Sequence, residues 1–306
     1  IGEPLSHGHI TDMVARVKAA GCRTELITNG TLLTEKRARS LIAAGLDLLW
    51  VSIDGARPES YADVRLGAEL PRVLENLRRF RRLRRPAHHP VPEIGIAFVA
   101  MQRNIGDLPE LLRLGKSLGV MHFHVSNLLP HTEPMSHEVL YAEALRSITY
   151  SPSPWLRRLI LPKMDLNEQT IGPFRAALDS GYNVIFAGTN LGLSNDVCTF
   201  IESGSMIVGW DGSVSPCSPL LYTHVGYLRG YERKSYRHII GHIGQRGLVD
   251  LWLDPEYVEY RERVHRFAFA PCSYCGGCEM SRDNLTDCFD NPMPACGGCL
   301  WAQGVV

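Results

Sequence analysis

The sequence predicts an α/β protein in which helices cover a parallel sheet and a smaller cysteine-rich domain follows. Helical patterns alternate with near-continuous apolar runs between residues 1 and 130, as expected for strands that are buried on both faces. Each helix–strand unit spans about 25–35 residues, which suits a β/α barrel or a part of one. The cysteines mark the second domain, because eight of the nine lie between residues 198 and 299.

Apolar spacing and end signals predict the elements of the first domain in order. Residues 9–21 carry apolar side chains at helical spacing and end in Gly21, and residues 34–45 form an amphipathic helix that starts at Thr34 and ends at Gly45. Two more helices are predicted over residues 69–85, which are basic, and over residues 108–119. Strands are predicted over residues 24–30, 46–55, 92–101 and 120–129.

Prolines interrupt this pattern after residue 130, and we expect residues 131–197 to bridge two domains. A helix is predicted to start near residue 131, and a strand over residues 182–188. Residues 205–217 predict a β-hairpin with its turn at Asp211-Gly212, and residues 248–267 predict a helix. The predicted domains are therefore residues 1–130 and 198–306, joined by the bridge.

Composition excludes several classes of partner. The net charge is zero and the pI is about 7.3, so we expect no nucleic acid and no anionic membrane surface as a partner. No apolar run approaches the roughly 20 residues of a membrane-spanning helix. The first 197 residues hold only Cys22, unlike a small secreted disulfide domain, so a reducing cytoplasm is expected.

The spacing of the cysteines predicts metal. Cys272, Cys275 and Cys278 follow at intervals of three, as do Cys296 and Cys299, and such spacing lets neighbouring thiolates bind one centre. The remaining three are Cys198, Cys217 and Cys288, and eight thiolates suffice for two four-cysteine sites. Four disulfides and two zinc ions are the alternatives, whereas the CxxCxxC run favours two iron–sulfur clusters.

The hairpin and the tail indicate how these ligands are brought together. The segment reads Cys198-x13-Gly212-x4-Cys217, so a turn at Gly212 folds both thiolates toward one cluster. The tail after residue 267 is rich in Gly and Pro. Because it has too few apolar contacts to form a core of its own, we expect metal to hold it together.

Polar residues follow the predicted strands where functional loops of β/α barrels lie. They are Thr28-Asn29-Gly30, the segment 52–55 and Ser126-Asn127. Ordinary strand-end turns are the alternative interpretation.

Other residues have a structural and a functional interpretation. His122 and His124 alternate on a strand and so face one side, where they contact substrate or are hydrogen-bonded interior histidines. Cys22 is expected to be a small buried residue. The arginine-rich segment 78–85 is expected to be a solvated helix face or a dock for an acidic partner, and the His88-His89 loop to be solvated.

Taken in order, GEP at 2–4, TNG at 28–30, SIDG at 52–55, the Cys-x13-Gly-x4-Cys segment and the CxxC-bearing tail resemble the radical SAM enzymes with a SPASM domain. The resemblance implies a partial (β/α)6 barrel followed by a SPASM domain with two auxiliary [4Fe–4S] clusters. It also implies reductive cleavage of S-adenosylmethionine to a 5′-deoxyadenosyl radical. The expected substrate is a peptide or protein, and the expected electron donor is a ferredoxin or flavodoxin. The ending CFDNPMPACGGCLWAQGVV resembles the maturases of tungsten-cofactor oxidoreductases.

Residues that would contact S-adenosylmethionine follow from the same resemblance. Gly2, Glu3 and Pro4 match the end of the family's GGEP motif, where a glutamate and strand-end backbone receive the amino group. Asn29 belongs to the next loop. Ser52 and Asp54 match the polar loop at the ribose or carboxylate end of the cofactor, and Arg65 matches an arginine that binds its carboxylate. An exposed surface role is the alternative for Arg65.

The chain departs from the family in two places. The family's CxxxCxxC motif, which binds a third, catalytic [4Fe–4S] cluster upstream of GEP, is not in these 306 residues. We therefore expect an N-terminally truncated fragment that is inactive alone. The tail spacing also differs, and by order Cys198, Cys217 and Cys288 are assigned to one cluster and Cys272, Cys275 and Cys278 to the other. The resemblance leaves Cys296 and Cys299 unassigned.

A different class of function fits part of the pattern. A non-catalytic β/α protein with a zinc-ribbon-like tail for binding partners would also use paired CxxC units. A metal-free, aldolase-like barrel would leave the cysteine-rich tail unexplained.

Overall fold

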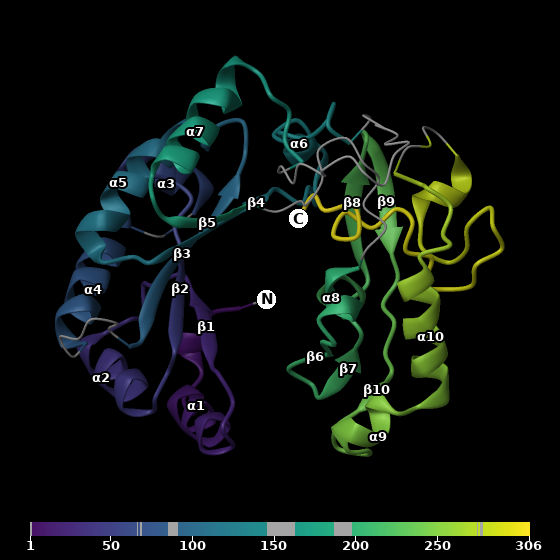
Figure 1. The fold of residues 1–306 in the computed structure, drawn as a ribbon, viewed down its shortest axis with the longest axis horizontal. Coiled ribbons are helices and arrows are strands. Elements are labelled where there is room, and N and C mark those ends of the chain that lie inside the picture. Colours follow the sequence, from purple (N-terminus) through teal and green to yellow (C-terminus); the bar gives the residue numbers. More distant parts are fainter. Residues whose placement is uncertain are drawn as a thin grey trace, which may run out of the picture. The chain divides into compact units, whose positions relative to one another are not determined.

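The computed structural model describes residues 2–65, 67, 69–84, 91–145, 163–186, 198–273, 275 and 278–306. The chain forms two compact units (Figure 1). Unit 1 comprises Ile1–Ser126 and Leu166–Phe186, and unit 2 comprises Asn127–Asp165 and Ala187–Val306. His88 and His89 lie outside the described residues.

Unit 1 is a five-stranded sheet with helices on one face. The strands are β1 (Glu25–Thr28), β2 (Leu48–Ser52), β3 (Glu93–Ala100), β4 (His122–Asn127) and β5 (Asn183–Phe186). The helices are α1 (Ile10–Ala19), α2 (Glu35–Ala43), α3 (Pro58–Val64), α4 (Leu70–Leu83), α5 (Leu108–Leu118) and α7 (Glu168–Asp179), with the 3-10 turns η1 (Pro4–Ser6) and η2 (Ile105–Asp107).

The strands lie in the sheet in the order in which they occur along the chain. The pairs β1·β2, β2·β3 and β4·β5 are parallel. Consecutive parallel strands joined by right-handed crossovers place all connecting helices on the same face, and Figure 1 shows α1, α2, α4, α5 and α7 on one side of the sheet. The carboxyl ends of neighbouring strands therefore share one edge.

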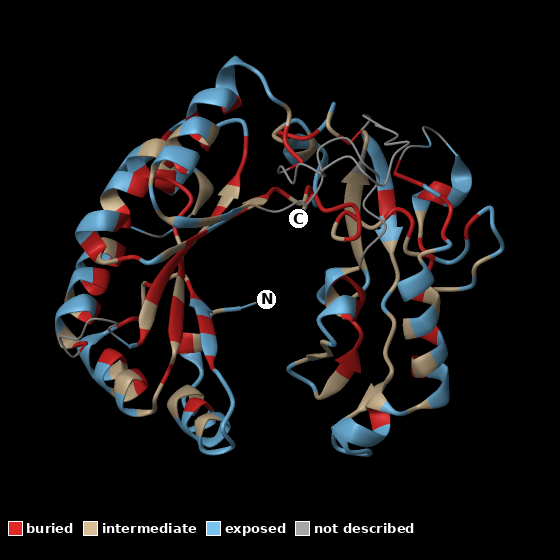
Figure 2. Cartoon of the chain, viewed as in Figure 1, coloured by how far each residue is buried: buried red, intermediate tan, exposed pale blue. Residues whose placement is uncertain are grey.

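The core of unit 1 lies between this sheet and its helices (Figure 2). Leu49, Val51, Ile94 and Ile96 are fully buried on the strands. The apolar face of α4 supplies Val73, Leu77 and Phe80 at helical spacing. Each such side chain contributes roughly 1.5–3 kcal/mol when it is fully buried, so the repeating apolar pattern is what assembles the unit.

The structure confirms the α/β class and the parallel sheet, with differences at particular elements. α3 and α7 were not predicted, and α7 and β5 pack with unit 1 although they lie in the predicted bridge. α7 contains Pro173, and prolines led the sequence analysis to expect irregular chain. β5 lies within the predicted strand 182–188, of which residues 187 and 188 are outside the described residues.

Two single-residue expectations were wrong. Cys22 is exposed, because it lies in the turn that leads from α1 to β1. Arg84 is buried, unlike its exposed neighbours Arg81 and Arg82. It donates through Nη1 to the Pro92 carbonyl at 2.7 Å, so the last turn of α4 is tied to the start of β3.

Unit 2 consists of short elements. Its strands are β6 (Ile207–Val208), β7 (Ser213–Ser215), β8 (His224–Leu228), β9 (Tyr231–Ser235) and β10 (Gly241–His242). Its helices are α6 (Glu133–Ser136), α8 (Thr199–Glu202), α9 (Leu248–Trp252) and α10 (Pro255–Arg266), with the 3-10 turns η3 (Ser218–Leu220) and η4 (Glu279–Arg282).

The predicted hairpin at 205–217 is confirmed by the antiparallel pair β6·β7, and β10 adds a third strand. Two helix predictions were wrong in extent. The helix expected over 248–267 is divided into α9 and α10, because Asp254 caps a new helix and Pro255 cannot continue the old one. The helix expected near residue 131 is only the four-residue α6.

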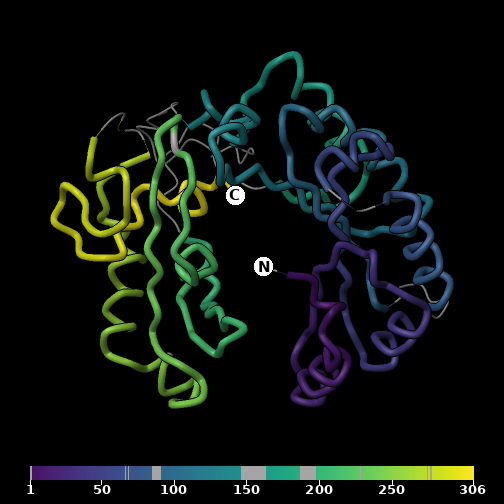
Figure 3. Tube along the Cα trace, turned by 180° about the vertical axis from the view of Figure 1, so that it is seen from behind, coloured from purple at the N-terminus to yellow at the C-terminus, as the bar shows by residue number. Residues whose placement is uncertain are grey.

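The tail after α10 contains only η4 as a named helix among its described residues, and Figure 3 shows it as loops near the end of α10. It still contributes buried side chains. Phe269 joins Ile201, Leu220 and Tyr257 in one apolar cluster, against which Cys198 and Cys296 pack. The tail is therefore held in part by packing against α8 and α10.

The described residues include no helix that is both long enough and apolar enough to span a bilayer.

Candidate functional site

The GEP and TNG segments are joined by one carboxylate. Glu3 Oε1 accepts from the Leu5 amide at 2.9 Å and from Thr28 Oγ1 at 2.6 Å. Glu3 Oε2 accepts from the Asn29 amide at 2.8 Å. The structure therefore brings Glu3 and Asn29 together at the carboxyl end of β1, and three donors already occupy the carboxylate.

The TNG turn requires its glycine. Gly30 has φ +76°, and a Cβ atom there would lie 2.9 Å from Val73 Cγ1 of α4 and 3.0 Å from Val51 Cγ1 of β2. Both the left-handed backbone and the close packing exclude a side chain. Asn29 Oδ1 accepts from the amide and hydroxyl of Thr31 at 2.9 and 2.6 Å, so the side-chain oxygen shapes its own loop.

Asp54 and Arg65 form the second part of the site. Arg65 Nε donates to Asp54 Oδ2 at 2.6 Å, and the Val99 amide donates to Asp54 Oδ1 at 2.7 Å. Asp54 is only 2% exposed. Arg65 is the C-cap residue directly after α3 and is half-buried, which differs from the fully exposed alternative. One of the five guanidinium N–H donors is thus used internally.

Gly55 allows α3 to approach this loop, because a Cβ atom there would lie 2.5 Å from the Tyr61 amide nitrogen. Tyr61 is fully buried, and its hydroxyl oxygen has no hydrogen-bond partner among the described residues. Burial raises the pKa of Tyr61, while the nearby charges of Arg65 and Asp54 act in opposite directions. The phenol therefore stays protonated beside the Asp54–Arg65 pair.

Two buried asparagines that the sequence analysis missed support these loops. Asn104 Nδ2 donates to the carbonyls of Asp54 and Val99 at 3.0 and 2.8 Å. Asn76 Nδ2 donates to the Gly30 carbonyl at 2.9 Å. Asn76 had a signal in the sequence, since it stands on the apolar face of α4 beside Leu77.

Asn29, Ser52 and Asp54 thus lie at the carboxyl ends of the neighbouring strands β1 and β2. Two sets of the predicted contact residues touch. Glu3 binds the Asn29 loop, and Asp54 binds Arg65. Ser52 is the last residue of β2, and Pro4 begins η1 directly after Gly2 and Glu3. This edge offers carboxylates and carbonyls for an ammonium group and a guanidinium for a carboxylate.

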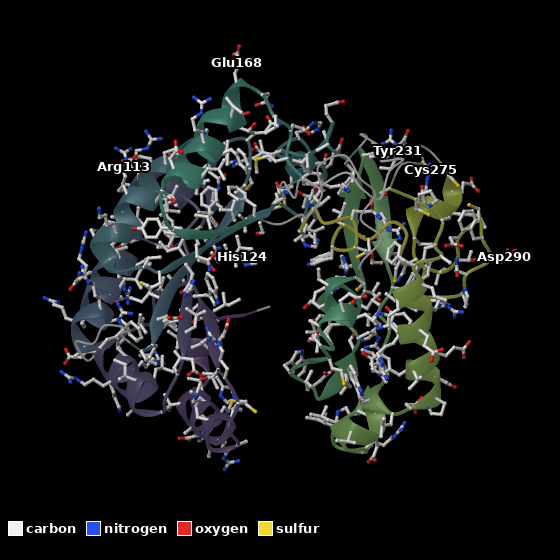
Figure 4. The ribbon with its side chains drawn as sticks, in the orientation of Figure 1. Arg113, His124, Glu168, Tyr231, Cys275 and Asp290 are labelled. Atoms are coloured by element: carbon white, nitrogen blue, oxygen red, sulfur yellow. The ribbon has the colours of Figure 1, made fainter. Side chains whose placement is uncertain are left out.

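His122 is the first residue of β4, at the end of the sheet opposite to this edge, and His124 lies two residues further along the strand. His122 is 3.0 Å from Glu93 Oε2 through Nε2 and 3.3 Å from Asn183 Nδ2 through Nδ1, which matches the interpretation as a hydrogen-bonded histidine. Both rings lie against Trp50, with centroids 6.1 Å apart. Burial lowers the pKa of His124. Figure 4 shows His124 on the side of the sheet away from Arg113 of α5.

In unit 2, Cys198, Cys217, Cys296 and Cys299, here called the first cysteine group, line one mainly apolar cavity of about 70 Å³. Burial raises the pKa of Cys217 well above its usual range, and the charges of Cys299, Cys296 and Cys198 raise it further. Burial also raises the pKa of Cys296 to about 12. Without metal these thiols are therefore neutral at pH 7, and metal binding would release their protons.

Cys272, Cys275 and Cys288 form the second cysteine group. Burial raises the pKa of Cys272 to about 11, the Arg233 charge lowers it, and Asp287, Cys275 and Cys288 raise it. Cys275 and Cys288 are exposed, and Figure 4 shows Cys275 at the surface of unit 2. Cys278 is also exposed and lies just before η4.

The grouping differs from the one expected from order along the chain. Cys288 lies with Cys272 and Cys275, whereas Cys296 and Cys299 accompany Cys198 and Cys217. The reason is that Asp287 accepts from the amides of Ala270, Phe289 and Asn291 at 2.9, 3.0 and 3.1 Å. These bonds hold the loop around Cys288 against the chain that leads into Cys272.

Both groups present thiols, the donor type of an iron–sulfur site. Four thiols around one apolar cavity match the four-cysteine set of a [4Fe–4S] cluster. All nine cysteines are free thiols, so the structure contains none of the four alternative disulfides. Among the described residues, no three His, Cys, Asp or Glu side chains converge as they would on a single metal ion.

Comparisons with known proteins match both units. The family described as the radical SAM superfamily matches residues 1–126, and the SPASM iron–sulfur cluster-binding domain matches residues 198–279. A tungsten-containing aldehyde ferredoxin oxidoreductase cofactor-modifying protein of Pyrococcus furiosus is 30% identical over 316 residues, covering 100% of this chain and 81% of that protein. An AdoMet-dependent heme synthase of Methanosarcina barkeri is 34% identical over 129 residues, covering 42% of this chain and 35% of that protein.

Solved structures show the same fold. SuiB of Streptococcus suis aligns with a TM-score of 0.55 and 14% identity, covering 85% of this chain and 56% of that one. The same protein bound to its precursor peptide SuiA also aligns with a TM-score of 0.55, covering 92% of this chain and 60% of that one. The chain thus spans less than two thirds of the length of this structural relative.

Proposed function

Since the chain belongs to the radical SAM superfamily and carries a SPASM domain, we propose that it is a maturase that uses S-adenosylmethionine to modify a peptide, a protein or the cofactor of a tungsten-dependent oxidoreductase. When bound, S-adenosylmethionine and its catalytic cluster supply a 5′-deoxyadenosyl radical for hydrogen abstraction. The residues of this chain bind and orient the reactants. The relative that spans the whole chain is named for modifying a tungsten-enzyme cofactor, which supports the substrate class.

The observation that carries the proposal is the gathering of seven cysteines of unit 2 into two groups. We propose that Cys198, Cys217, Cys296 and Cys299 hold one auxiliary [4Fe–4S] cluster. Cys272, Cys275 and Cys288, with Cys278 as the fourth ligand, would hold the other. Two full sets of four thiolates leave no iron open for substrate, so these clusters would pass electrons or stabilise the domain.

For unit 1 we propose distinct roles at the carboxyl edge of the sheet. Gly2, Glu3 and Pro4 would receive the amino group of S-adenosylmethionine, chiefly through backbone carbonyls, since three donors already occupy the Glu3 carboxylate. Arg65 would bind the cofactor carboxylate, with Asp54 holding its Nε. Ser52 and Asn29 would line the ribose side.

The remaining parts of the proposal concern groups outside this chain. None of its nine cysteines forms a CxxxCxxC run, so we propose that the ligands of the third cluster lie outside these 306 residues and that the 306 residues alone are inactive. We further propose a ferredoxin or flavodoxin as electron donor and a cytoplasmic location, which suits free thiols.

Formation of 5′-deoxyadenosine tests this proposal. The protein would be reconstituted with iron and sulfide, reduced with dithionite and supplied with S-adenosylmethionine. One sample contains the 306 residues alone, and a second carries a CxxxCxxC-bearing segment ahead of residue 1. We expect product from the second only. Product from the first would contradict the placement of the third cluster, and none from a cluster-loaded second sample would contradict the function.

A further inference from the structure

We propose that Arg233 is the shared counter-ion of the two cysteine groups and that its positive charge raises the reduction potentials of both clusters held there. The inference rests on the proposed function, in which each group holds an iron–sulfur cluster. Arg233, which no sequence motif singles out, thereby has an electrostatic role toward both groups.

The guanidinium of Arg233 lies between segments that carry the two groups. Arg233 is 8% exposed. Its Nη1 donates to the carbonyl of Ser281 in η4, three residues after Cys278. On the other side it lies against Gly298, where a Cβ atom would be 2.7 Å from Arg233 Cζ. Gly298 stands between Cys296 and Cys299, so the planar guanidinium of Arg233 contacts both the η4 segment and the loop from Cys296 to Cys299.

The groups around Arg233 that can become negatively charged are mainly cysteines, which carry that charge once they bind metal. Its guanidinium interacts electrostatically with Cys272 of the second group and with Cys299 and Cys296 of the first, and also with Asp283. Among the ion pairs of the described residues, none joins Arg233 to a carboxylate. It also lines the cavity of the first cysteine group. Its neighbours Lys234 and Glu232 are exposed on the same strand.

A buried cation without a paired anion is costly, because it loses its hydration without a compensating charge. Thiolate-ligated clusters carry net negative charge, and here they would lie on two sides of the guanidinium. Each cluster that forms would therefore stabilise Arg233, and Arg233 would stabilise each cluster. The effect is larger for the reduced cluster, which holds one more electron. Net charge and hydrogen bonding are the means by which proteins set such potentials.

The absence of a side chain at Gly298 leaves the space that the guanidinium of Arg233 occupies. A side chain there would overlap the guanidinium, since three of its atoms lie within 3.0 Å of the Cβ position. The contact with Arg233 therefore explains why Gly298 of the CGGC segment is a glycine. The spacing of the cysteines alone does not require a glycine at this position.

The test compares reduction potentials in four anaerobic proteins: wild type, Arg233→Gln, Arg233→Lys and Lys234→Met. Arg233→Gln removes the charge but keeps a donor for the Ser281 carbonyl, whereas Arg233→Lys keeps the charge. Lys234→Met is the control, because it removes the same charge from the exposed face of the same strand. Iron and sulfide are counted first, and each cluster is then titrated with dithionite while its reduced form is followed by electron paramagnetic resonance.

We expect both clusters of Arg233→Gln to bind an electron at least tenfold more weakly than wild type, which is about 59 mV for one electron. Arg233→Lys and Lys234→Met are expected to stay close to wild type. Loss of iron from both groups in Arg233→Gln but not in Arg233→Lys would also support the shared counter-ion.

Three results would overturn the inference while leaving the proposed function intact. They are unchanged potentials in Arg233→Gln, a shift in one cluster only, and equal defects in Arg233→Gln and Arg233→Lys, which would show a packing role. A wild-type protein without clusters would instead contradict the proposed function itself.

Discussion

At the scale of single residues, burial of the cysteine side chains sets the protonation state of their thiols. Burial holds the thiols of the first cysteine group protonated in the absence of metal, with the pKa of Cys296 at about 12. A neutral thiol is a weak ligand, so cluster assembly must displace protons into solvent. The same burial protects the finished site, whereas Cys275 and Cys288 of the second group are exposed.

Arg65 is the residue whose side chain most directly tests the S-adenosylmethionine site. Arg65→Ala removes a charged donor from the proposed carboxylate contact, which is worth roughly 1.5–3 kcal/mol. We expect the dissociation constant of S-adenosylmethionine, measured by calorimetry on the cluster-loaded protein, to rise about 10- to 100-fold. Arg78→Ala on the exposed face of α4 is the matched control. Equal affinities in Arg65→Ala and wild type would rule out the assigned contact.

At the scale of elements, α3 is held in place by one buried carboxylate. Asp107 accepts from the Ala56 amide at 3.0 Å, from Arg57 Nη2 at 2.9 Å and from the Ser60 hydroxyl. Burial alone would raise the pKa of Asp107, but these donors outweigh it and the pKa is lowered. The carboxylate thereby fixes α3, the helix that Arg65 follows directly.

This arrangement predicts a pH dependence of stability. The folded-state pKa of Asp107 lies below its value of about 4 in the unfolded chain, so its contribution is present above pH 4 and is lost as the pH falls through the folded-state pKa. We expect Asp107→Asn to destabilise the protein by about 2 kcal/mol at pH 7, and the difference from wild type to shrink on acidification. The measurement is the thermal unfolding midpoint of each protein at pH 7 and at a pH below 4.

Asp63→Asn controls for the loss of charge, because Asp63 is an exposed aspartate on the same helix. It should change the midpoint little at either pH. A difference between wild type and Asp107→Asn that is independent of pH would contradict the assigned role of the carboxylate.

A helix, strand or turn could be predicted where the residues of that segment carried the signal themselves, such as an apolar run or a turn motif. The strands of unit 1 could be read directly, because each is a short apolar run between polar ends. The β8·β9 hairpin was not predicted, since its turn is Arg229-Gly230, with φ of 54° and 81°, rather than Asn-Gly or Asp-Gly. The split between α9 and α10 had a local signal, Asp254-Pro255, which the sequence analysis did not use.

At the scale of the whole chain, the order of the motifs predicted the family and the fold class, and the comparisons confirm both. Which cysteines lie together in each group could not be predicted in this way. Sequence order placed Cys288 with Cys198 and Cys217, but the bonds of Asp287 place it beside Cys272. Likewise, Arg233 and Asn104 act through neighbours distant in sequence, and only the folded chain brings these together.

The metal content of the 306-residue chain decides whether unit 2 binds two iron–sulfur clusters. The protein would be purified without oxygen, and its iron, acid-labile sulfide and zinc counted against protein concentration, together with its visible absorbance. We expect about eight iron and eight sulfide per chain and a brown protein that absorbs near 400 nm, as two [4Fe–4S] clusters require. A colourless protein with about two zinc ions and no sulfide would contradict it.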